Sequence, residues 1–186
     1  MPKAHDRLMN CASRFLMTLL VLAILAGQDC RAELSEVQIE SAYVFNFIKF
    51  VEWPVDTLNA GSKIRLCVLG NDALQTSLST LNGRKAGAYE LQVIPKSSGG
   101  EGFGSCHVLY IDELEQRHLI PILKSLGNKH VLTISDIPNF AERGGGIGLV
   151  FREDKVLFEI NLASVRKAGL LLSSQMLNLA VNIFGK

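Results

Sequence analysis

The chain has 186 residues, with 19 basic and 18 acidic side chains and a formal net charge of +1 at pH 7. This balance lacks the basic excess that attracts nucleic acid or anionic lipid, so neither is expected as a partner. The length excludes a large multidomain protein and suits one domain with one sizeable core.

The N-terminus predicts a cleaved signal peptide over residues 1–32. Basic residues precede an apolar run of 13 residues at positions 15–27. A membrane-spanning helix needs about 20 residues, so a retained anchor is the less favoured alternative. Cleavage is expected after Ala32, and the 19 basic and 18 acidic residues then fall by four and two, to 15 and 16. The mature protein, residues 33–186, is expected outside the cytoplasm with a net charge near −1.

The first half of the mature chain predicts two helices and two strands. The first helix has a broad apolar arc and stops before Pro54, because the residue before a proline disfavours helical backbone. Asp72 is expected to cap the second helix, and Gly83 to end it. In order, we expect a helix at 38–53, a strand at 63–69, a helix at 73–82 and a half-exposed strand around 89–93.

The second half continues the alternation and closes with a hairpin. Asp112, Asn161 and Ser173 are expected to cap three helices. In order, we expect a strand at 106–111, a helix from 112 to 126, a strand at 130–134, hairpin strands at 147–151 and 156–160, a short helix ending at 169 and a last helix reaching residue 182. The prediction is a single-domain, Rossmann-like α/β fold. Its mixed, mainly parallel sheet is flanked by helices on both faces, with the hairpin at one edge.

Two cysteines remain after removal of the signal peptide. Cys67 and Cys106 each fall within a predicted strand. Paired cysteines are usual in exported proteins, so a disulfide is predicted, with two separate buried thiols as the alternative. The sequence contains no CxxC redox motif and no Cys/His pattern with zinc spacing.

No signature of catalysis or cofactor binding appears. The glycines at 144–148 lead into a strand, whereas a phosphate-binding loop leads into a helix, so no nucleotide site is expected. The histidines are scattered without metal-ligand spacing. Asp112 and Asp136 follow strands where α/β enzymes place active sites, but both also suit helix capping, which we favour. We therefore predict no enzyme, no cofactor and no metal.

Two residues do not fit a plain core. Phe45 falls on the polar side of the first predicted helix, and Glu159 lies within an apolar strand. Glu159 could simply face solvent. Alternatively, a polar helix face and an edge strand that carry these residues could form a protein-binding patch.

Several motifs resemble the YfiR-like family of exported bacterial proteins, in unbroken order over essentially the whole mature chain. They lie at residues 43–54 (YVFNFIKFVEWP), 105–111 (SCHVLYI), 144–148 (GGGIG), 158–162 (FEINL), 168–170 (AGL) and 173–175 (SSQ), and Cys67 and Cys106 match the paired cysteines of the family.

The resemblance implies a periplasmic inhibitor. It would bind the periplasmic part of an inner-membrane diguanylate cyclase, lowering cyclic di-GMP and biofilm formation. An outer-membrane lipoprotein with a peptidoglycan-binding domain could sequester it, and a homodimer is a further expectation. Ile147, Glu159 and Val165 match partner-binding positions, to which we add Phe45. A second cysteine pair near the glycine turn is absent here, so redox behaviour tied to that pair is not expected.

Two other functions are weighed beside this one. A periplasmic small-molecule sensor could use a crevice at the strand ends and serve another membrane receptor. A hydrolase is disfavoured because no nucleophile and base pattern is present.

Overall fold

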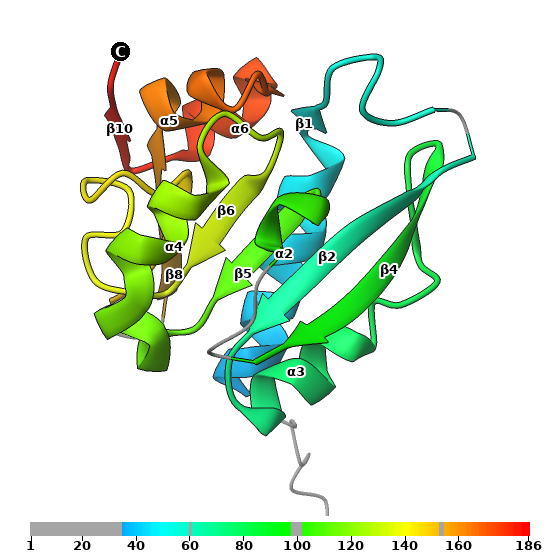
Figure 1. The fold of residues 1–186 in the computed structure, drawn as a ribbon. Helices are drawn as coiled ribbons and strands as arrows, with labels where there is room; N and C mark the ends of the chain where they lie inside the picture. The colour runs from blue at the N-terminus through cyan, green and yellow to red at the C-terminus, as the bar shows by residue number, and fades with distance from the viewer. Residues whose placement is uncertain (1–34, 60, 98–101, 153–154) are drawn as a thin grey trace, which may run out of the picture. The chain divides into compact units, whose positions relative to one another are not determined.

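The computed structural model describes residues 35–59, 61–97, 102–152 and 155–186, so the predicted signal peptide lies outside the described residues. Ser35–Lys186 forms one compact unit, built on an eight-stranded sheet of order β10-β8-β7-β6-β5-β2-β4-β3 (Figure 1). In these ranges no helix is long and apolar enough to cross a membrane.

The elements alternate along the chain as expected for an α/β fold. The helices are α2 (Glu36–Lys49), α3 (Asp72–Ser79), α4 (Leu119–Leu126), α5 (Leu162–Lys167) and α6 (Ser174–Leu179), with 3₁₀ helices η1 (Phe103–Ser105) and η2 (Glu113–His118). The strands are β1 (Val51–Glu52), β2 (Lys63–Leu69), β3 (Lys85–Ala86), β4 (Tyr89–Lys96), β5 (Val108–Ile111), β6 (Leu132–Ser135), β7 (Ile147–Arg152), β8 (Lys155–Asn161), β9 (Leu171–Leu172) and β10 (Asn182–Phe184).

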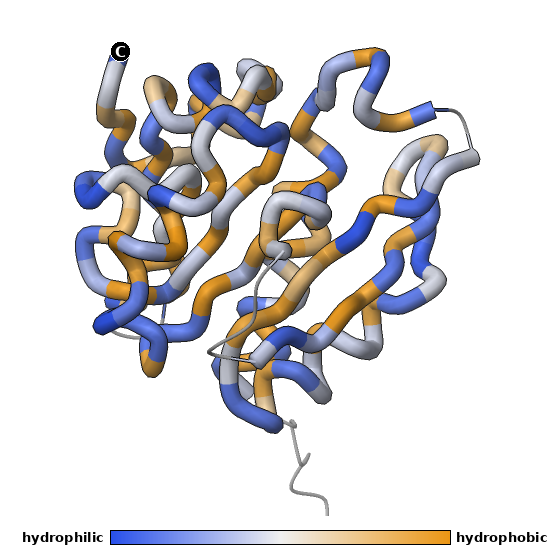
Figure 2. Tube along the Cα trace, viewed as in Figure 1, coloured by the Kyte–Doolittle hydropathy of each residue, from blue (hydrophilic) through white to orange (hydrophobic). Residues whose placement is uncertain are grey.

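The sheet is mainly parallel, and helices cover both faces. Strands β4, β2, β5, β6 and β7 pair in parallel, whereas β7–β8 and β3–β4 are antiparallel. Alternate side chains of β2 point to opposite faces: Leu66 packs in the core under α2 and α3, and Cys67 in the core under α4. Figure 1 shows α4 in front of the sheet and α2 behind it, and Figure 2 shows the apolar central strands between them. The predicted fold class is confirmed.

The first helix is shorter than predicted, and strand β1 follows it. The amide of Phe50 bonds to Phe47 O at 3.0 Å, which ends α2 at Lys49. Val51–Glu52 then pairs antiparallel with Leu171–Leu172. Pro54 favours extended backbone just before it, and the partner strand supplies the hydrogen bonds. The prediction of helix up to residue 53 is therefore wrong.

The helix predicted from 112 to 126 divides into η2 and α4. The Asp112 carboxylate accepts a hydrogen bond from Leu114 N at 2.8 Å, as a helix cap does. Pro121 has no amide hydrogen and cannot bond to the fourth residue before it, so a continuous α-helix is disfavoured. The second predicted helix is likewise capped by Asn71 rather than Asp72, because the Asn71 side chain accepts from Leu74 N at 2.9 Å.

The C-terminus contains a strand that the sequence did not predict. Helix α6 ends at Leu179, and Ala180 is extended. Asn182–Phe184 then pairs in parallel with Glu159–Asn161 of β8. The prediction of helix up to residue 182 is wrong, and so is the edge position of the hairpin, because β10 lies outside β8.

The predicted disulfide is present. Cys67 on β2 and Cys106, just before β5, are bonded with their Cα atoms 5.8 Å apart. Both are buried in the core under α4. The bond therefore ties the two central strands together.

Removing this bond is expected to destabilise the fold. A closed loop spanning a separation of 39 residues corresponds to about 4 kcal/mol in the chain-entropy model. Urea unfolding of the Cys67→Ala/Cys106→Ala variant should show a loss of up to about that amount. Reductant should lower the urea midpoint of unfolding of the wild-type protein and should not change the midpoint of the double variant. Two free thiols in periplasmic protein would contradict the assignment.

Candidate functional site

Phe45 packs beneath a basic side chain rather than standing free. It is half-buried against the core under α2. The Arg84 guanidinium carbon lies 4.2 Å from the ring centroid, and Lys49 Nζ lies 5.6 Å from it. Phe45 thus lies among basic side chains, and Arg84, directly before β3, covers the ring in a cation–π arrangement.

Glu159 lies between β7 and β10 and does not face open solvent. Its register partners are Gly148 and Asn182, and only 9% of the residue is exposed. Asn182 Nδ2 donates a hydrogen bond of 2.7 Å to Glu159 Oε1. The expectation of a solvent-facing side chain on an edge strand is wrong, because β10 covers this edge and supplies the hydrogen-bond partner.

The other two predicted contact residues are enclosed in the core. Ile147 is 0% exposed and Val165 is 2% exposed. Direct contact of either with a partner would require this part of the core to open. Phe45 lies by β3 and Glu159 by β10, at opposite edges of the sheet, so the structure does not bring the four residues into one surface.

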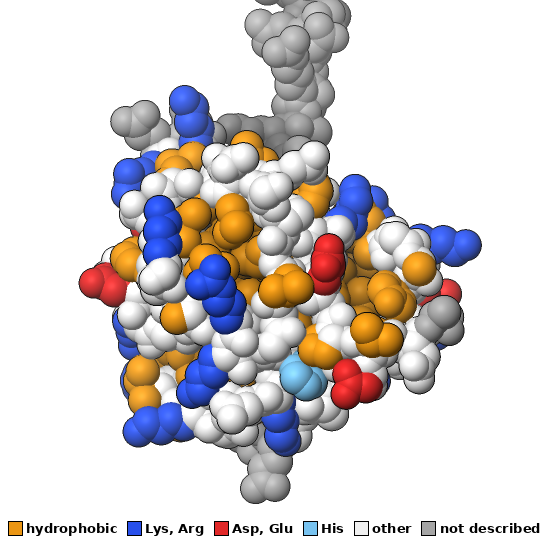
Figure 3. Space-filling view, turned by 90° about the horizontal axis from the view of Figure 1, so that it is seen from above, with side chains coloured by type: hydrophobic (Ala, Val, Ile, Leu, Met, Phe, Trp, Pro, Cys, Tyr) orange, Lys and Arg blue, Asp and Glu red, His pale blue; other side chains and the backbone are white. Residues whose placement is uncertain are grey.

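Three of the six large apolar residues that are exposed in the described ranges come from the C-terminal segment. Leu171 is 61% exposed, Leu179 69% and Val181 41%. They come from β9, the end of α6 and the residue before β10, and we call them the C-terminal apolar face. Figure 3, seen from above, shows apolar side chains gathered among lysines and arginines on that side of the molecule. Exposed apolar side chains mark a protein interaction site where they form a contiguous patch.

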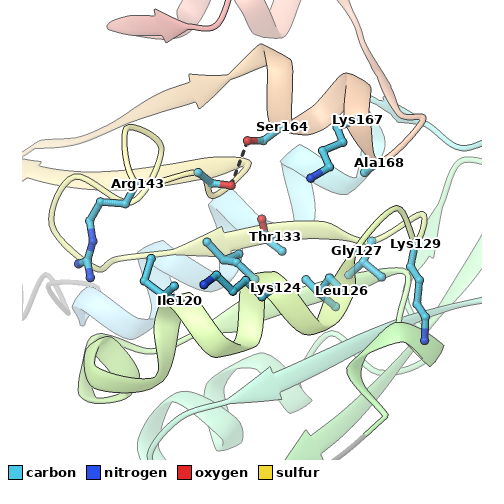
Figure 4. A pocket seen from close by; sticks show the side chains of 13 residues that line it. Ile120, Lys124, Leu126, Gly127, Lys129, Thr133, Arg143, Ser164, Lys167 and Ala168 are labelled. Atoms are coloured by element: carbon cyan, nitrogen blue, oxygen red, sulfur yellow. Dashed lines mark hydrogen bonds between the residues drawn. The ribbon is translucent and has the colours of Figure 1, made fainter.

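A basic cavity of about 350 Å³ lies between α4 and α5 (Figure 4). Four basic residues and no acidic residue are among those that line it: Lys124, Lys129, Arg143 and Lys167. Within the described ranges none of the four forms an ion pair. The adjoining glycine amides are already used, since Gly145 N bonds to Phe140 O and Gly146 N to Thr133 Oγ1. The glycine turn therefore offers a ligand no phosphate-binding amides there.

An acidic crevice of about 280 Å³ lies where β2, β5 and β6 end. The sequence indicated two of its residues, Asp112 and Asp136, and interpreted both as helix caps. The capping role of Asp112 is confirmed, and its Oδ2 also accepts from Asn71 Nδ2 at 3.0 Å. The crevice is lined by Glu36, Val37, Glu40, Asn71, Leu74, Asp112, Glu113, Leu114 and Asp136.

Burial and mutual repulsion change the acidity of this crevice. Burial first, and then the charges of Asp136, Glu36 and Asp112, raise the pKa of Glu40 to about 8. Burial, together with Asp112 and Glu113, raises the pKa of Asp136 to about 7, although backbone hydrogen bonds oppose the change. Tyr110, beneath the crevice, has its pKa raised by burial and by the same carboxyl groups. Glu40 is therefore mostly protonated at neutral pH.

The contribution of α2 to this crevice could not be predicted from local sequence patterns. Glu36 and Glu40 lie one turn apart on α2 and meet Asp112 and Asp136 only in the folded chain. No group of three or more His, Cys, Asp or Glu side chains among the described residues is arranged to hold a metal ion.

The stability of the protein should depend on Glu40. Its pKa is raised from 4.5 to about 8 on folding, so its contribution is fully present below pH 4.5 and is lost as the pH rises to about 8. The free energy of unfolding should fall over this range by up to about 1.4 kcal/mol per pH unit from this group. Glu40→Gln should flatten the dependence and be more stable than wild type at pH 8. Urea unfolding from pH 5 to pH 8, with exposed Glu142→Gln outside the crevice as control, checks this; parallel curves for wild type and Glu40→Gln would contradict it.

Comparison with known proteins gives a family and a fold. The YfiR/HmsC-like family matches residues 37–181. The crystal structure of a conserved domain protein from Vibrio cholerae is similar, with a TM-score of 0.54 and 12% sequence identity. The similarity covers 81% of this chain and 61% of that one, and at this identity it shows the fold alone. The YfiR-like family is a periplasmic, regulatory family concerned with diguanylate cyclase signalling. Because the match spans most of its length, this chain belongs to the YfiR/HmsC-like family.

Proposed function

We propose that this protein represses an inner-membrane diguanylate cyclase by binding its periplasmic part. Cyclic di-GMP is made in the cytoplasm, so a protein predicted to be exported must act on its synthesis through a partner that spans the membrane. Binding would hold the cyclase in its inactive state and lower cyclic di-GMP and biofilm formation. Family membership supports this role, and a purely regulatory protein needs no catalytic group.

The observation that supports a binding role most directly is the C-terminal apolar face. Leu171 and Leu179 are more than half exposed and Val181 is 41% exposed, although all three are apolar. Transfer of one such side chain from water into an interface contributes about 1.5–3 kcal/mol. These three residues of the C-terminal segment could therefore contribute the centre of an interface with the cyclase.

The predicted residues would then act by supporting this face. The hydrogen bond between Glu159 and Asn182 fixes β10 against β8, directly after Val181. Val165 O accepts from Leu170 N at 3.1 Å, next to Leu171. Ile147 packs in the same core as Val165. We assign these three residues a positioning role, whereas Phe45 and Arg84 form a separate site by β3.

An inhibitor can shift the equilibrium between the active and inactive states of its target only by the difference between its binding free energies for the two states. Sequestration by an outer-membrane lipoprotein would relieve repression if that lipoprotein covers the same face. The basic groups of the cavity by α5 would favour a partner surface that carries acidic residues.

The substitution Leu179→Asn should weaken binding to the cyclase without changing the stability of the fold. Loss of one central apolar contact, about 2 kcal/mol, should weaken capture of the cyclase roughly thirtyfold and raise cellular cyclic di-GMP. The melting temperature should not change, because the side chain is 69% exposed. Leu114→Asn is a matched control, since Leu114 is also 69% exposed but lies at the acidic crevice. Equal capture by the two variants would exclude this face, and unchanged cyclic di-GMP on deletion of the gene would exclude the regulatory role.

Two substitutions at Glu159 test its positioning role. Glu159→Gln keeps an acceptor for Asn182 Nδ2 and should capture the cyclase normally. Glu159→Ala removes the acceptor, should loosen β10 and should weaken capture. Pull-down with the purified periplasmic part of the cyclase measures both. Equal loss in both variants, with unchanged melting temperatures, would instead show that the carboxylate itself contacts the partner.

A further inference from the structure

The acidic crevice occupies the place where α/β folds bind ligands. From β2 the chain crosses through α3 to β4 on one side, and later returns to β5 on the other side of β2. The carboxyl ends of β2 and β5 therefore diverge into a crevice at the topological switch point. Gly70 allows their close approach, because a Cβ atom there would lie 2.7 Å from Asp112 Cβ.

The lining of the crevice combines negative charge with apolar walls. Five carboxyl groups and no basic group line it: Glu36, Glu40, Asp112, Glu113 and Asp136. Val37, Leu74 and Leu114 supply the apolar part. This composition fits a positively charged ligand with a short hydrocarbon body.

Buried polar atoms at the crevice lack partners. Asp136 Oδ1 is buried and makes no hydrogen bond of ordinary geometry. Tyr110 is 0% exposed, and its hydroxyl, which also has no partner of ordinary geometry, interacts with the Glu40 carboxyl group. A buried polar group without a hydrogen-bond partner destabilises the fold. A ligand with several N–H donors would satisfy the acceptors that the fold leaves open.

A bare metal ion does not fit, because no three side chains in the described part of the chain are placed to chelate one. Ammonium groups at the ends of a flexible chain can reach carboxyl groups that are too far apart to share one ion. We propose that the acidic crevice binds a small organic cation with primary ammonium groups, of the size of a short diamine. This site is independent of the C-terminal apolar face.

Binding should be linked to release of protons. The charged groups that face Glu40 are all acidic: Glu36 on its own helix, and Asp112 and Asp136 at the strand ends. An ammonium group would favour the ionised carboxylates, so the pKa values of Glu40 and Asp136, about 8 and about 7, should fall on binding. Affinity should therefore rise as the pH increases from 6 to 8.5.

The test is calorimetric titration of protein purified from the periplasm with 1,4-diaminobutane. We expect saturable binding at one site, at least about tenfold tighter at pH 8.5 than at pH 6, with proton release seen as a dependence on buffer ionisation enthalpy. The isosteric neutral compound 1,4-butanediol should not bind, and magnesium chloride should not displace the diamine beyond the effect of ionic strength.

The variants are Glu40→Gln and Asp136→Asn, with Glu142→Gln as an exposed acidic control outside the crevice. Unchanged melting temperatures or a stabilised fold would show that the variants are intact. Each crevice variant should weaken diamine binding at least about tenfold, and the control should not. The proposal is overturned by absence of saturable binding at every pH, by equal binding of the diol, by unaltered binding in the double variant, or by stoichiometric magnesium binding that excludes the diamine.

Discussion

The pairing of β2 with β5 is the contact on which the rest of the architecture depends. Strand β2 carries β4 on one side and β5 on the other, and its alternate side chains enter both cores. The Cys67–Cys106 bond joins the two strands covalently on the face under α4. The divergence of the same pair at its carboxyl end opens the acidic crevice. One strand pair thus determines both the rigid centre and the position of the candidate ligand site.

The proposed binding surface exposes apolar side chains to water, whereas the proposed ligand site buries carboxyl groups. At the C-terminus, apolar side chains stay in water, and β10 and the Glu159–Asn182 bond support the segment that carries them. At the crevice, carboxyl groups are withdrawn from water and respond by holding protons. Exposed apolar side chains and buried carboxyl groups both lower the stability of the folded protein. Their presence therefore points to a function.

Much of the fold could be predicted from local sequence patterns. Strand β2 lies at 63–69 as predicted, and the disulfide followed from the expected compartment and the cysteine count. Strand β10 could not be predicted, because a three-residue strand exists only through its pairing with β8. A crevice at the strand ends, and Asp112 and Asp136 at its edge, could be predicted, but the contribution of Glu40 could not, because α2 meets these strand ends only in the folded chain. The contact of Phe45 with Arg84 could not be predicted either, because the two residues are distant in sequence.

The two cavities also give the protein an electrical polarity. Lys129 and Val131 of the basic cavity precede β6, whereas Asp136 of the acidic crevice follows it, so the two charge clusters lie toward opposite ends of the parallel strands. The charge separation should grow as the pH rises, because Glu40 and Asp136 ionise near pH 8 and pH 7. A charged surface of a partner would attract the end of opposite charge within a Debye length of about 8 Å. The orientation in which the protein meets a membrane-bound partner would then be partly selected before contact.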